Sequence, residues 1–286
     1  MSTKTVSFGA GKREGHDSRV FYARRMVPRA PGGRSGIPVN PPPEMLDRLI
    51  CRSSESMGEL PDDCVAFMVT SPPYNVGKDY DVDLSLEEYL GLLRRVLAET
   101  FRVLEPGGRV AVNVANLGRR PYLALNHRVA SVLEEIGYLL RGEIVWQKAQ
   151  GAGGSCAWGS WCSAKNPTLR DVHEYIVVAS KGSFRRLRLG EDTISRREFL
   201  EATTSVWSIA PASARRIGHP APFPVELPRR LIELYTFKDD LVLDPFMGSG
   251  STAVAAIESG RHYLGYETES AYLEIARARI AAAQGG

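Results

Sequence analysis

Two segments of the chain combine residue types that could do chemistry. The first is Ser71-Pro72-Pro73-Tyr74, which follows a short apolar run. Consecutive prolines fix φ and remove two backbone N–H donors, so the carbonyl groups around them remain as rigid hydrogen-bond acceptors. Ser71 adds a hydroxyl group, and Tyr74 adds a flat aromatic face. A plain turn could use Ser-Pro-Pro, but it would not need the tyrosine.

These four residues suit a reaction at an amino group carried by an aromatic ring. The lone pair of such an amine is delocalised into the ring, which makes the nitrogen a poor nucleophile. Hydrogen bonds from its N–H protons to preorganised acceptors favour the more tetrahedral nitrogen that develops during attack. Tyr74 can stack on a base that has swung out of a duplex. The predicted catalytic residues are therefore Ser71, Pro72, Pro73 and Tyr74.

The second segment is a glycine-rich turn, Asp244-Pro245-Phe246-Met247-Gly248-Ser249-Gly250-Ser251-Thr252, between an apolar run and an alanine-rich stretch. Gly248 and Gly250 would let the backbone approach a ligand, and a helix N-terminus offers unpaired N–H groups. The spacing is neither the full dinucleotide fingerprint nor a P-loop. Glu267 ends a second apolar run, seventeen residues after Gly250. A carboxylate there can accept both ribose hydroxyls of an adenosine-containing ligand, although a tight turn and an exposed acid would give the same residues.

Alternating strand and helix patterns must position these segments. Short apolar runs predict strands at 64–70, 109–114, 141–147, 173–179, 241–243 and 262–266. Apolar residues at helical spacing predict helices at 86–104, 123–136, 225–237 and 270–282. Ser85 and Glu88 form a capping box before the first helix. The alternation indicates an α/β fold with a mostly parallel sheet and helices on both faces.

Three segments lack such periodicity. Residues 1–43 are rich in Arg, Gly and Pro, which predicts a basic arm ahead of a domain over residues 44–286. Residues 149–171 form a long loop with two tryptophans, and long loops are uncommon unless they have a function. Residues 181–217 hold eight Lys/Arg against four acids, within a chain of net charge +3. Such basic clusters suit a polyanionic partner, although a solvated face has the same composition.

Other site classes are disfavoured. The cysteines, Cys51, Cys64, Cys156 and Cys162, form no Cys-x-x-Cys pair, so we predict free thiols in a reducing compartment and no metal site. No apolar run approaches the roughly 20 residues of a membrane span, and the N-terminus lacks the apolar core of a secretory signal. The sequence thus predicts a cytoplasmic protein without a membrane partner.

Thr70–Asn75 and the glycine-rich turn together make the chain similar to the amino-DNA methyltransferases, the N4-cytosine and N6-adenine enzymes of bacterial modification systems. The catalytic motif precedes the cofactor motif, as in their β class, which is a circular permutation of the usual order. The resemblance runs from Met45 to Ala283. Three weaker matches support it: Pro106-Gly107-Gly108, His173-Glu174-Tyr175 and His219-Pro220-Ala221-Pro222-Phe223-Pro224.

The resemblance implies a circularly permuted Rossmann-like fold with a mostly parallel, seven-stranded sheet. It also implies transfer of a methyl group from S-adenosylmethionine to an amino group of a base flipped out of double-stranded DNA. The residues that would bind the cofactor are Asp244, Pro245, Phe246, Gly248, Ser249, Gly250, Thr252, Glu267, Phe223 and Asn75. Two further partners are considered: a cognate restriction endonuclease, and a second copy of the chain in a homodimer.

The first residue of the catalytic motif bears on the target base. Serine, here Ser71, is typical of N4-cytosine enzymes, whereas adenine enzymes more often carry Asp or Asn. We therefore expect N4 of cytosine, with N6 of adenine as the alternative. Many relatives also have Gly-Asp where this chain has Arg52-Ser53-Ser54-Glu55. An acidic contact to the adenine of the cofactor is thus missing or shifted to Glu55.

Two segments are candidates for DNA recognition. In the β class this region usually follows the His-Glu-Tyr strand, which here means residues 181–217, and the tryptophan loop is the second candidate. Phosphate contacts would position the enzyme without specifying sequence. The residues expected at DNA are Lys78, Trp158, Trp161, Arg185, Arg186, Arg215 and Arg216.

Rival interpretations lack their own signatures. Enzymes that methylate a protein glutamine or an RNA base amine usually have Asn first in the motif and an earlier cofactor motif, and both features are absent. A ring-carbon cytosine methyltransferase needs a nucleophilic Cys after Pro, and no Cys here follows Pro. A non-catalytic DNA-binding protein that keeps the fold stays open. Cofactor binding without methyl transfer would identify it.

Overall fold

The computed structural model describes residues 36–73, 84–116, 121–148, 159–213 and 223–285. The chain divides into two units, residues 1–32 and 33–286, and the second unit is the one described below. Most of the predicted arm over residues 1–43 lies outside the described residues. Its last part is tied to the domain, because the Val39 N–H donates to the Asp63 carbonyl at 2.8 Å.

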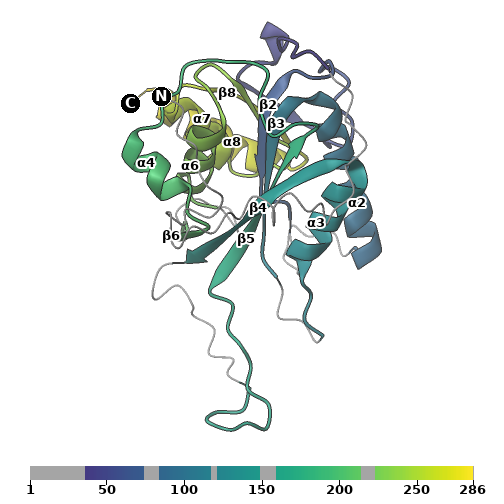
Figure 1. Cartoon of the computed structure of the whole chain (residues 1–286), viewed down its shortest axis with the longest axis vertical. Helices are drawn as coiled ribbons and strands as arrows, with labels where there is room; N and C mark the ends of the chain where they lie inside the picture. Colours follow the sequence, from purple (N-terminus) through teal and green to yellow (C-terminus); the bar gives the residue numbers. More distant parts are fainter. Residues whose placement is uncertain (1–35, 74–83, 117–120, 149–158, 214–222, 286) are drawn as a thin grey trace, which may run out of the picture. The chain divides into compact units, whose positions relative to one another are not determined.

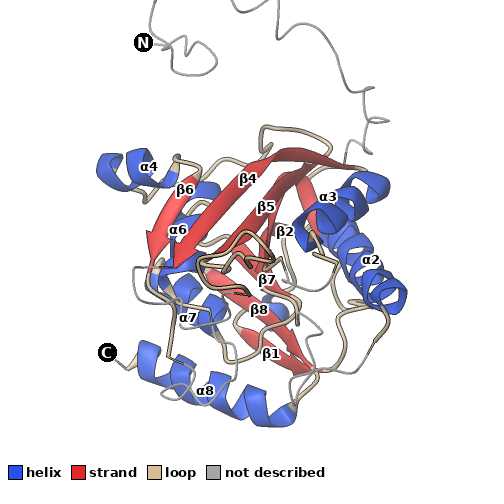
Figure 2. Cartoon of the chain, turned by 90° about the horizontal axis from the view of Figure 1, so that it is seen from below, coloured by secondary structure: helices blue, strands red, loops and turns tan. Residues whose placement is uncertain are grey.

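An eight-stranded sheet forms the centre of the domain (Figures 1 and 2). Its strands are β1 Arg48–Cys51, β2 Val65–Thr70, β3 Leu104–Val114, β4 Tyr138–Lys148, β5 His173–Lys181, β6 Val206–Ile209, β7 Leu241–Asp244 and β8 His262–Glu267. Their order in the sheet is β1-β8-β7-β2-β3-β5-β4-β6. Strand β5 is antiparallel to both of its neighbours, and the other pairs are parallel.

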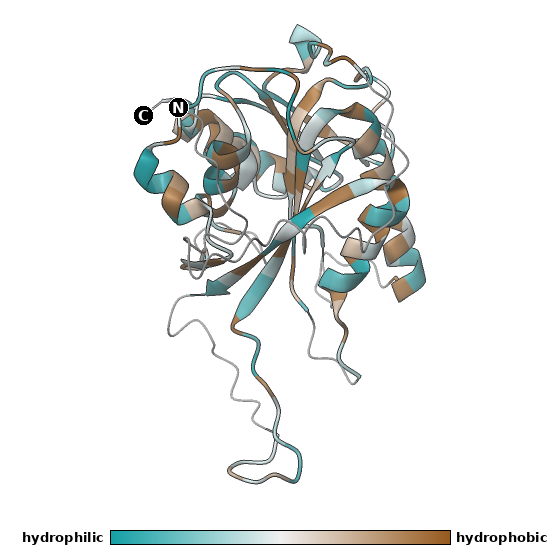
Figure 3. Cartoon of the chain, in the orientation of Figure 1, coloured by the Kyte–Doolittle hydropathy of each residue, from teal (hydrophilic) through white to brown (hydrophobic). Residues whose placement is uncertain are grey.

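Helices cover both faces of this sheet, as expected. They are α2 Leu86–Val103, α3 Leu125–Ile136, α4 Arg196–Ala202, α6 Glu226–Tyr235, α7 Ser251–Glu258 and α8 Ser270–Gln284, with a short 3-10 helix η2 at Pro43–Met45. Figure 2 shows α2 and α3 on one face, with α6 and α7 on the other. Polar and apolar residues alternate along α2 and α3 in Figure 3, as they should in helices that bury a single face.

The continuous apolar run of β2 explains its central place. All six residues of the strand are buried, and its side chains enter two separate cores. Met68 packs in the core beneath α2 and α3, whereas Phe67 and Val69 pack in the core beneath α6 and α7. A strand with helices on both faces needs this pattern, because neither of its faces meets water.

Local signals placed the helix ends correctly. The capping box before α2 is confirmed: the Ser85 hydroxyl accepts from the Glu88 N–H at 3.2 Å, and the Glu88 carboxylate accepts from the Ser85 N–H at 2.8 Å. Helix α3 ends at Gly137, which has φ of +109°. A residue without Cβ adopts this left-handed conformation at little cost.

Two expectations about the sheet were wrong. We expected seven strands, and the described residues contain eight. We also expected residues 181–217 to be irregular, yet they contain α4, with its own capping box at Ser195, and the edge strand β6. Both β1 and β6 span only four residues and are partly exposed, so they show no continuous apolar run. Short mixed segments of this kind cannot be separated from loops by periodicity.

Strand β3 also starts earlier than expected, at Leu104 rather than Arg109, and includes Pro106-Gly107-Gly108. Gly107 has φ of +79°, and a Cβ there would lie 2.0 Å from the Arg185 carbonyl oxygen. The glycine is therefore required by its positive φ and by this close backbone approach, at the point where the pairing of β3 with β2 shifts register.

Among the described residues, no helix is both long and apolar enough to cross a membrane. The same residues contain no group of three or more His, Cys, Asp or Glu that could hold a metal ion. Cys51, Cys64 and Cys162 are free thiols, and Cys64 is buried.

Candidate active site

The carboxyl ends of β2, β7 and β8 meet at one edge of the sheet, called the catalytic edge below. Thr70, the last residue of β2, donates from Oγ1 to Oδ1 of Asp244, the last residue of β7, at 2.7 Å. Glu267 ends β8, and its Oε2 accepts a hydrogen bond from the Gly248 N–H at 2.9 Å. Ser71, the glycine-rich turn and Glu267 come from distant parts of the sequence and are neighbours here.

Asp244 is held entirely by the protein. Its second oxygen accepts from the Thr252 hydroxyl at 2.5 Å, and its first also accepts from the Phe246 N–H at 3.0 Å. Asp244 and Thr252 are both 0% exposed. Burial raises the pKa of Asp244 to about 6, against the opposing effect of its hydroxyl donors. We expected these two residues to line the cofactor, but their side chains bind each other and fix the turn.

Close packing explains the glycines around the turn. Gly248 and Gly250 have φ of +51° and +81°. A Cβ on Gly250 would lie 2.9 Å from the Cβ of Ala276 in α8. On β8, a Cβ at Gly265 would lie 2.3 Å from Cε of Met247. Side chains at these positions would push the turn away from the sheet edge.

An arginine of α8 stabilises the turn by bonding to two serines within it. Arg279 of α8 donates from Nη1 to the Ser249 carbonyl at 2.6 Å and to the Ser251 hydroxyl at 3.2 Å. The Ser251 hydroxyl donates to the Phe223 carbonyl at 2.8 Å. The backbone of Phe223 therefore lies against the turn. Arg279 could not be identified from the sequence, because nothing in its helix pattern separates it from other solvent-facing arginines.

The segment after β1 also reaches the turn. Cys51 pairs with Glu267 across adjacent strands, and the Ser54 hydroxyl donates to the Pro245 carbonyl at 2.8 Å. Glu55 forms an ion pair with Arg95, and this interaction lowers the pKa of the Glu55 carboxyl group. The acid that we considered for the adenine contact is thus engaged by α2.

A polar network lies behind Ser71. Asn113, near the end of β3, donates from Nδ2 to the Ser71 hydroxyl at 3.3 Å and to the Glu174 carboxylate at 2.7 Å. Lys148, the last residue of β4, forms an ion pair with the other oxygen of Glu174 at 2.6 Å. A carboxylate only accepts hydrogen bonds, so Glu174 fixes the orientation of the amide.

Asn113 and Lys148 were not among the predicted site residues, and Glu174 was named only within the His-Glu-Tyr match. A usable signal was present for Asn113, which is a polar residue between two valines of an apolar strand. It is 1% exposed. A buried amide needs hydrogen-bond partners, and at a strand end those partners are often site residues.

Several predicted site residues lie outside the described residues: Tyr74, Asn75, Lys78, Trp158, Arg215 and Arg216. Trp161 is described and is 69% exposed. It belongs to the segment 159–172, which runs from the start of β5 away from the sheet in Figure 1. A bridge between Gly159 and Pro167 closes its end. Because β5 starts at the catalytic edge, this segment projects from the predicted side.

The expected DNA contacts of Arg185 and Arg186 need correction. Strand β5 runs antiparallel to β3, so it carries the chain from Glu174 at the catalytic edge to Lys181 at the opposite edge. Both arginines follow Lys181 and lie at that far edge. Arg186 is also buried and forms ion pairs with Glu105 and Asp240. It is a structural residue, and Arg185 is exposed on the wrong side for the site.

Comparison with known proteins agrees with this geometry. The chain matches the family model for N6/N4 methyltransferases, described as DNA methylase, over residues 65–278. The Type II methyltransferase M.MthZI of Methanothermobacter thermautotrophicus is 31% identical over 270 residues, which cover 82% of this chain and 76% of that protein. M.BglI of Bacillus subtilis, another Type II methyltransferase, is 28% identical over 285 residues, covering 77% of this chain and 81% of that protein.

Solved structures agree as well. The Thermus thermophilus protein TTHA0409, complexed with S-adenosyl-L-methionine, superposes with a TM-score of 0.68 at 27% identity, covering 84% of this chain and 96% of that one. PvuII DNA methyltransferase (cytosine-N4-specific) superposes with a TM-score of 0.67 at 20% identity over 81% of this chain and 85% of its own, which supports the fold alone.

Proposed function

The chain belongs to the N6/N4 DNA methylase family, and on that premise we propose that it methylates the exocyclic N4 amino group of cytosine at a specific site in double-stranded DNA. It is a DNA methyltransferase with the permuted Rossmann-like fold, and its cofactor is S-adenosylmethionine. The choice of cytosine and the roles of individual residues are the proposed part.

The observation that carries the choice of base is the serine at the catalytic edge. Ser71 stands where the adenine enzymes of the family more often have Asp or Asn. Its hydroxyl oxygen accepts from Asn113 at 3.3 Å, and this bond positions the side chain at the catalytic edge. A hydroxyl group can donate to a ring nitrogen of a base, while the backbone carbonyls of the motif accept from the amino group.

The residues of the motif act on the amine. An amino group that gains a methyl group must lose a proton, and its nitrogen must become more tetrahedral before it can attack. We assign the carbonyls of Ser71 and Pro72 to hold the N–H protons in that geometry. Asn113 and Glu174 are positioning residues, because Asn113 donates to the Ser71 hydroxyl and Glu174 accepts from Asn113.

The residues of the turn fit an adenosine-bearing cofactor. The Glu267 carboxylate is oriented by two N–H groups, those of Gly248 and Glu269, each at 2.9 Å. Gly248 offers no side chain on the approach to that carboxylate. We assign Glu267 to the ribose, and Phe246, Gly248, Ser249 and Phe223 to the remaining contacts. When bound, S-adenosylmethionine supplies the methyl group as an electrophile.

We also propose that DNA contacts the catalytic edge through segments that start there. One is 159–172 with the exposed Trp161. Another follows β6, because Ile209 ends beside Lys148 at the same edge. The names of the relatives M.MthZI and M.BglI, both Type II methyltransferases, further support a cognate restriction endonuclease as a partner.

Mass spectrometry of nucleosides tests the choice of base. Duplex DNA is incubated with the purified chain and S-adenosylmethionine carrying a deuterated methyl group, and is then digested enzymatically to nucleosides. We expect the label in N4-methylcytosine alone. Label in N6-methyladenine would overturn the assignment to cytosine and leave the family unaffected.

A further inference from the structure

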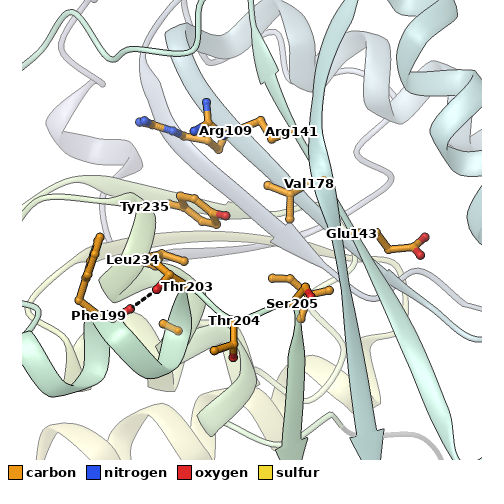
Figure 4. Close-up of a pocket in the computed structure, with 13 residues that line it drawn as sticks. Arg109, Arg141, Glu143, Val178, Phe199, Thr203, Thr204, Ser205, Leu234 and Tyr235 are labelled. Carbon is orange, nitrogen blue, oxygen red and sulfur yellow. Dashed lines mark hydrogen bonds between the residues drawn. The ribbon is translucent and has the colours of Figure 1, made fainter. Parts of the chain in front are cut away.

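A cavity of about 380 Å³ lies between the sheet and helices α4 and α6 (Figure 4). Arg109 of β3 and Arg141 of β4 lie at one end, beside Tyr235 of α6, and Phe199 of α4 lines a wall. Arg109 precedes Asn113 by four residues on the same strand, so the arginine end of the cavity lies about 13 Å from Asn113 along β3. None of the described residues that line the cavity belongs to the site described above.

The two arginines lack acidic partners among the described residues. Arg109 donates from Nη2 to the Phe184 carbonyl at 3.4 Å, and Arg141 donates from Nη1 to the same carbonyl at 3.0 Å and to the Ser180 hydroxyl at 3.4 Å. Within the part of the chain that is described, these bonds use a minority of the N–H donors of two guanidinium groups. The nearby Arg186, by contrast, forms ion pairs with two carboxylates.

The electrostatics of the pair call for a negative charge. The Nε atom of Arg109 is buried and has no hydrogen-bond acceptor among the described residues. Burial, followed by the charge of Arg141, lowers the pKa of Arg109 to about 10. Glu143 also lines the cavity, but its carboxylate accepts from Asn126 at 2.7 Å and points away from the arginines in Figure 4. Arg141 is exposed and Arg109 is half-buried, so this end of the cavity carries two like charges that an anion from solvent can reach.

We propose that this cavity binds a small aromatic phosphomonoester, with its phosphate group between Arg109 and Arg141. Guanidinium groups match phosphate oxygens in a bidentate manner. The ring of Tyr235 already lies 6.0 Å from the Arg109 guanidinium, and the half-exposed ring of Phe199 offers a face to an organic group. The volume falls in the range of small-molecule sites, roughly 300–1,000 Å³, and exceeds what a bare phosphate ion would fill.

Calorimetric titration of the full chain tests this proposal, with S-adenosylhomocysteine present to occupy the cofactor site. The probes are phenyl phosphate, inorganic phosphate and phenol. We expect phenyl phosphate to bind, inorganic phosphate to bind more weakly at the same place, and phenol not to bind. Arg109→Gln and Arg141→Gln should each raise the Kd for phenyl phosphate at least about tenfold. Arg94→Gln is the control, because Arg94 is exposed and pairs with Glu135, and this variant should leave the Kd for phenyl phosphate unchanged.

A second variant separates binding from folding. Phe199 is 48% exposed, so Phe199→Ala should fold normally. This variant should raise the Kd for phenyl phosphate by about threefold or more and leave the Kd for inorganic phosphate unchanged. Failure of the unmodified chain to bind phenyl phosphate, or equal binding by the Arg109→Gln variant, would overturn the proposal. Displacement of phenyl phosphate by duplex DNA would also overturn it, because DNA phosphate would then be the occupant.

Discussion

The Thr70 hydroxyl donates a hydrogen bond of 2.7 Å to Oδ1 of Asp244, and both side chains are buried. Thr70 directly precedes the Ser-Pro-Pro segment, and Asp244 begins the glycine-rich turn. This one bond therefore joins the strand end that carries the proposed catalytic residues to the strand end that carries the proposed cofactor residues. Disturbing it should affect both halves of the site.

We predict that Thr70→Val removes this donor and leaves a buried carboxylate short of a partner. The free energy of unfolding should fall by about 1–3 kcal/mol, and both the affinity for S-adenosylmethionine and the rate of transfer should decrease. Urea unfolding and equilibrium dialysis measure these effects. Thr204→Val, at an exposed threonine that follows α4, is the matched control. Equal losses in both variants would contradict the role of the Thr70 bond.

The raised pKa of Asp244 predicts a pH dependence. Its folded pKa of about 6 lies above the ordinary value of 3.8, so the stability linked to its protonated form is present at low pH. That stability is lost as the pH rises through about 6. Relative to the Asp244→Asn variant, the free energy of unfolding of the natural chain should fall by about 3 kcal/mol between roughly pH 4 and pH 7. A difference in unfolding free energy that stays constant over this range would show that Asp244 titrates normally.

We predict that Arg279→Ala loosens the turn, because the bonds from Arg279 to Ser249 and Ser251 are lost. The Kd for S-adenosylmethionine should rise roughly tenfold, with little change in the rate at saturating cofactor. Arg277→Ala is a close control, since Arg277 is exposed on the same helix and pairs only with Glu274 among the described residues. An unchanged Kd in Arg279→Ala would remove Arg279 from the site.

Glu174→Gln tests the network behind Ser71. The amide keeps the shape of the side chain but loses the ion pair with Lys148 and no longer fixes the orientation of Asn113. We expect kcat to fall about tenfold or more, while the affinity for S-adenosylmethionine stays within about twofold. A purely structural role would instead lower the unfolding temperature and leave kcat intact in the folded fraction.

Much of this arrangement could be predicted from the sequence, because strong local patterns mark it. The unbroken apolar run of β2 and the Ser85–Glu88 capping box placed a strand and a helix directly. The edge strand β6 could not be predicted, since four residues are too few to establish an alternating pattern and the strand depends on pairing with β4.

The residues of the proposed site also form two groups, those that sequence motifs predict and those that only the fold brings together. The motifs identified Ser71, Gly248 and Glu267, because the order of neighbouring residues alone marks the Ser-Pro-Pro segment, the glycine-rich turn and the acid that ends β8. Asn113, Lys148 and Arg279 join it only through contacts that the fold creates across strands and helices. The prediction that Arg185 contacts DNA was wrong for the opposite reason. Its charge suggested a DNA contact, but the antiparallel direction of β5 takes it to the far edge of the sheet.

Ser71→Ala tests the proposed catalytic edge most directly. Transfer of the labelled methyl group to duplex DNA is measured in a single turnover at saturating cofactor, alongside the Kd for S-adenosylmethionine of the same preparation. We predict that transfer falls to background while the Kd stays within about twofold of the unmodified chain, since Ser71 bonds to Asn113 and the variant keeps the bond from Thr70 to Asp244. Full transfer by the Ser71→Ala variant would contradict the assignment of this segment to catalysis.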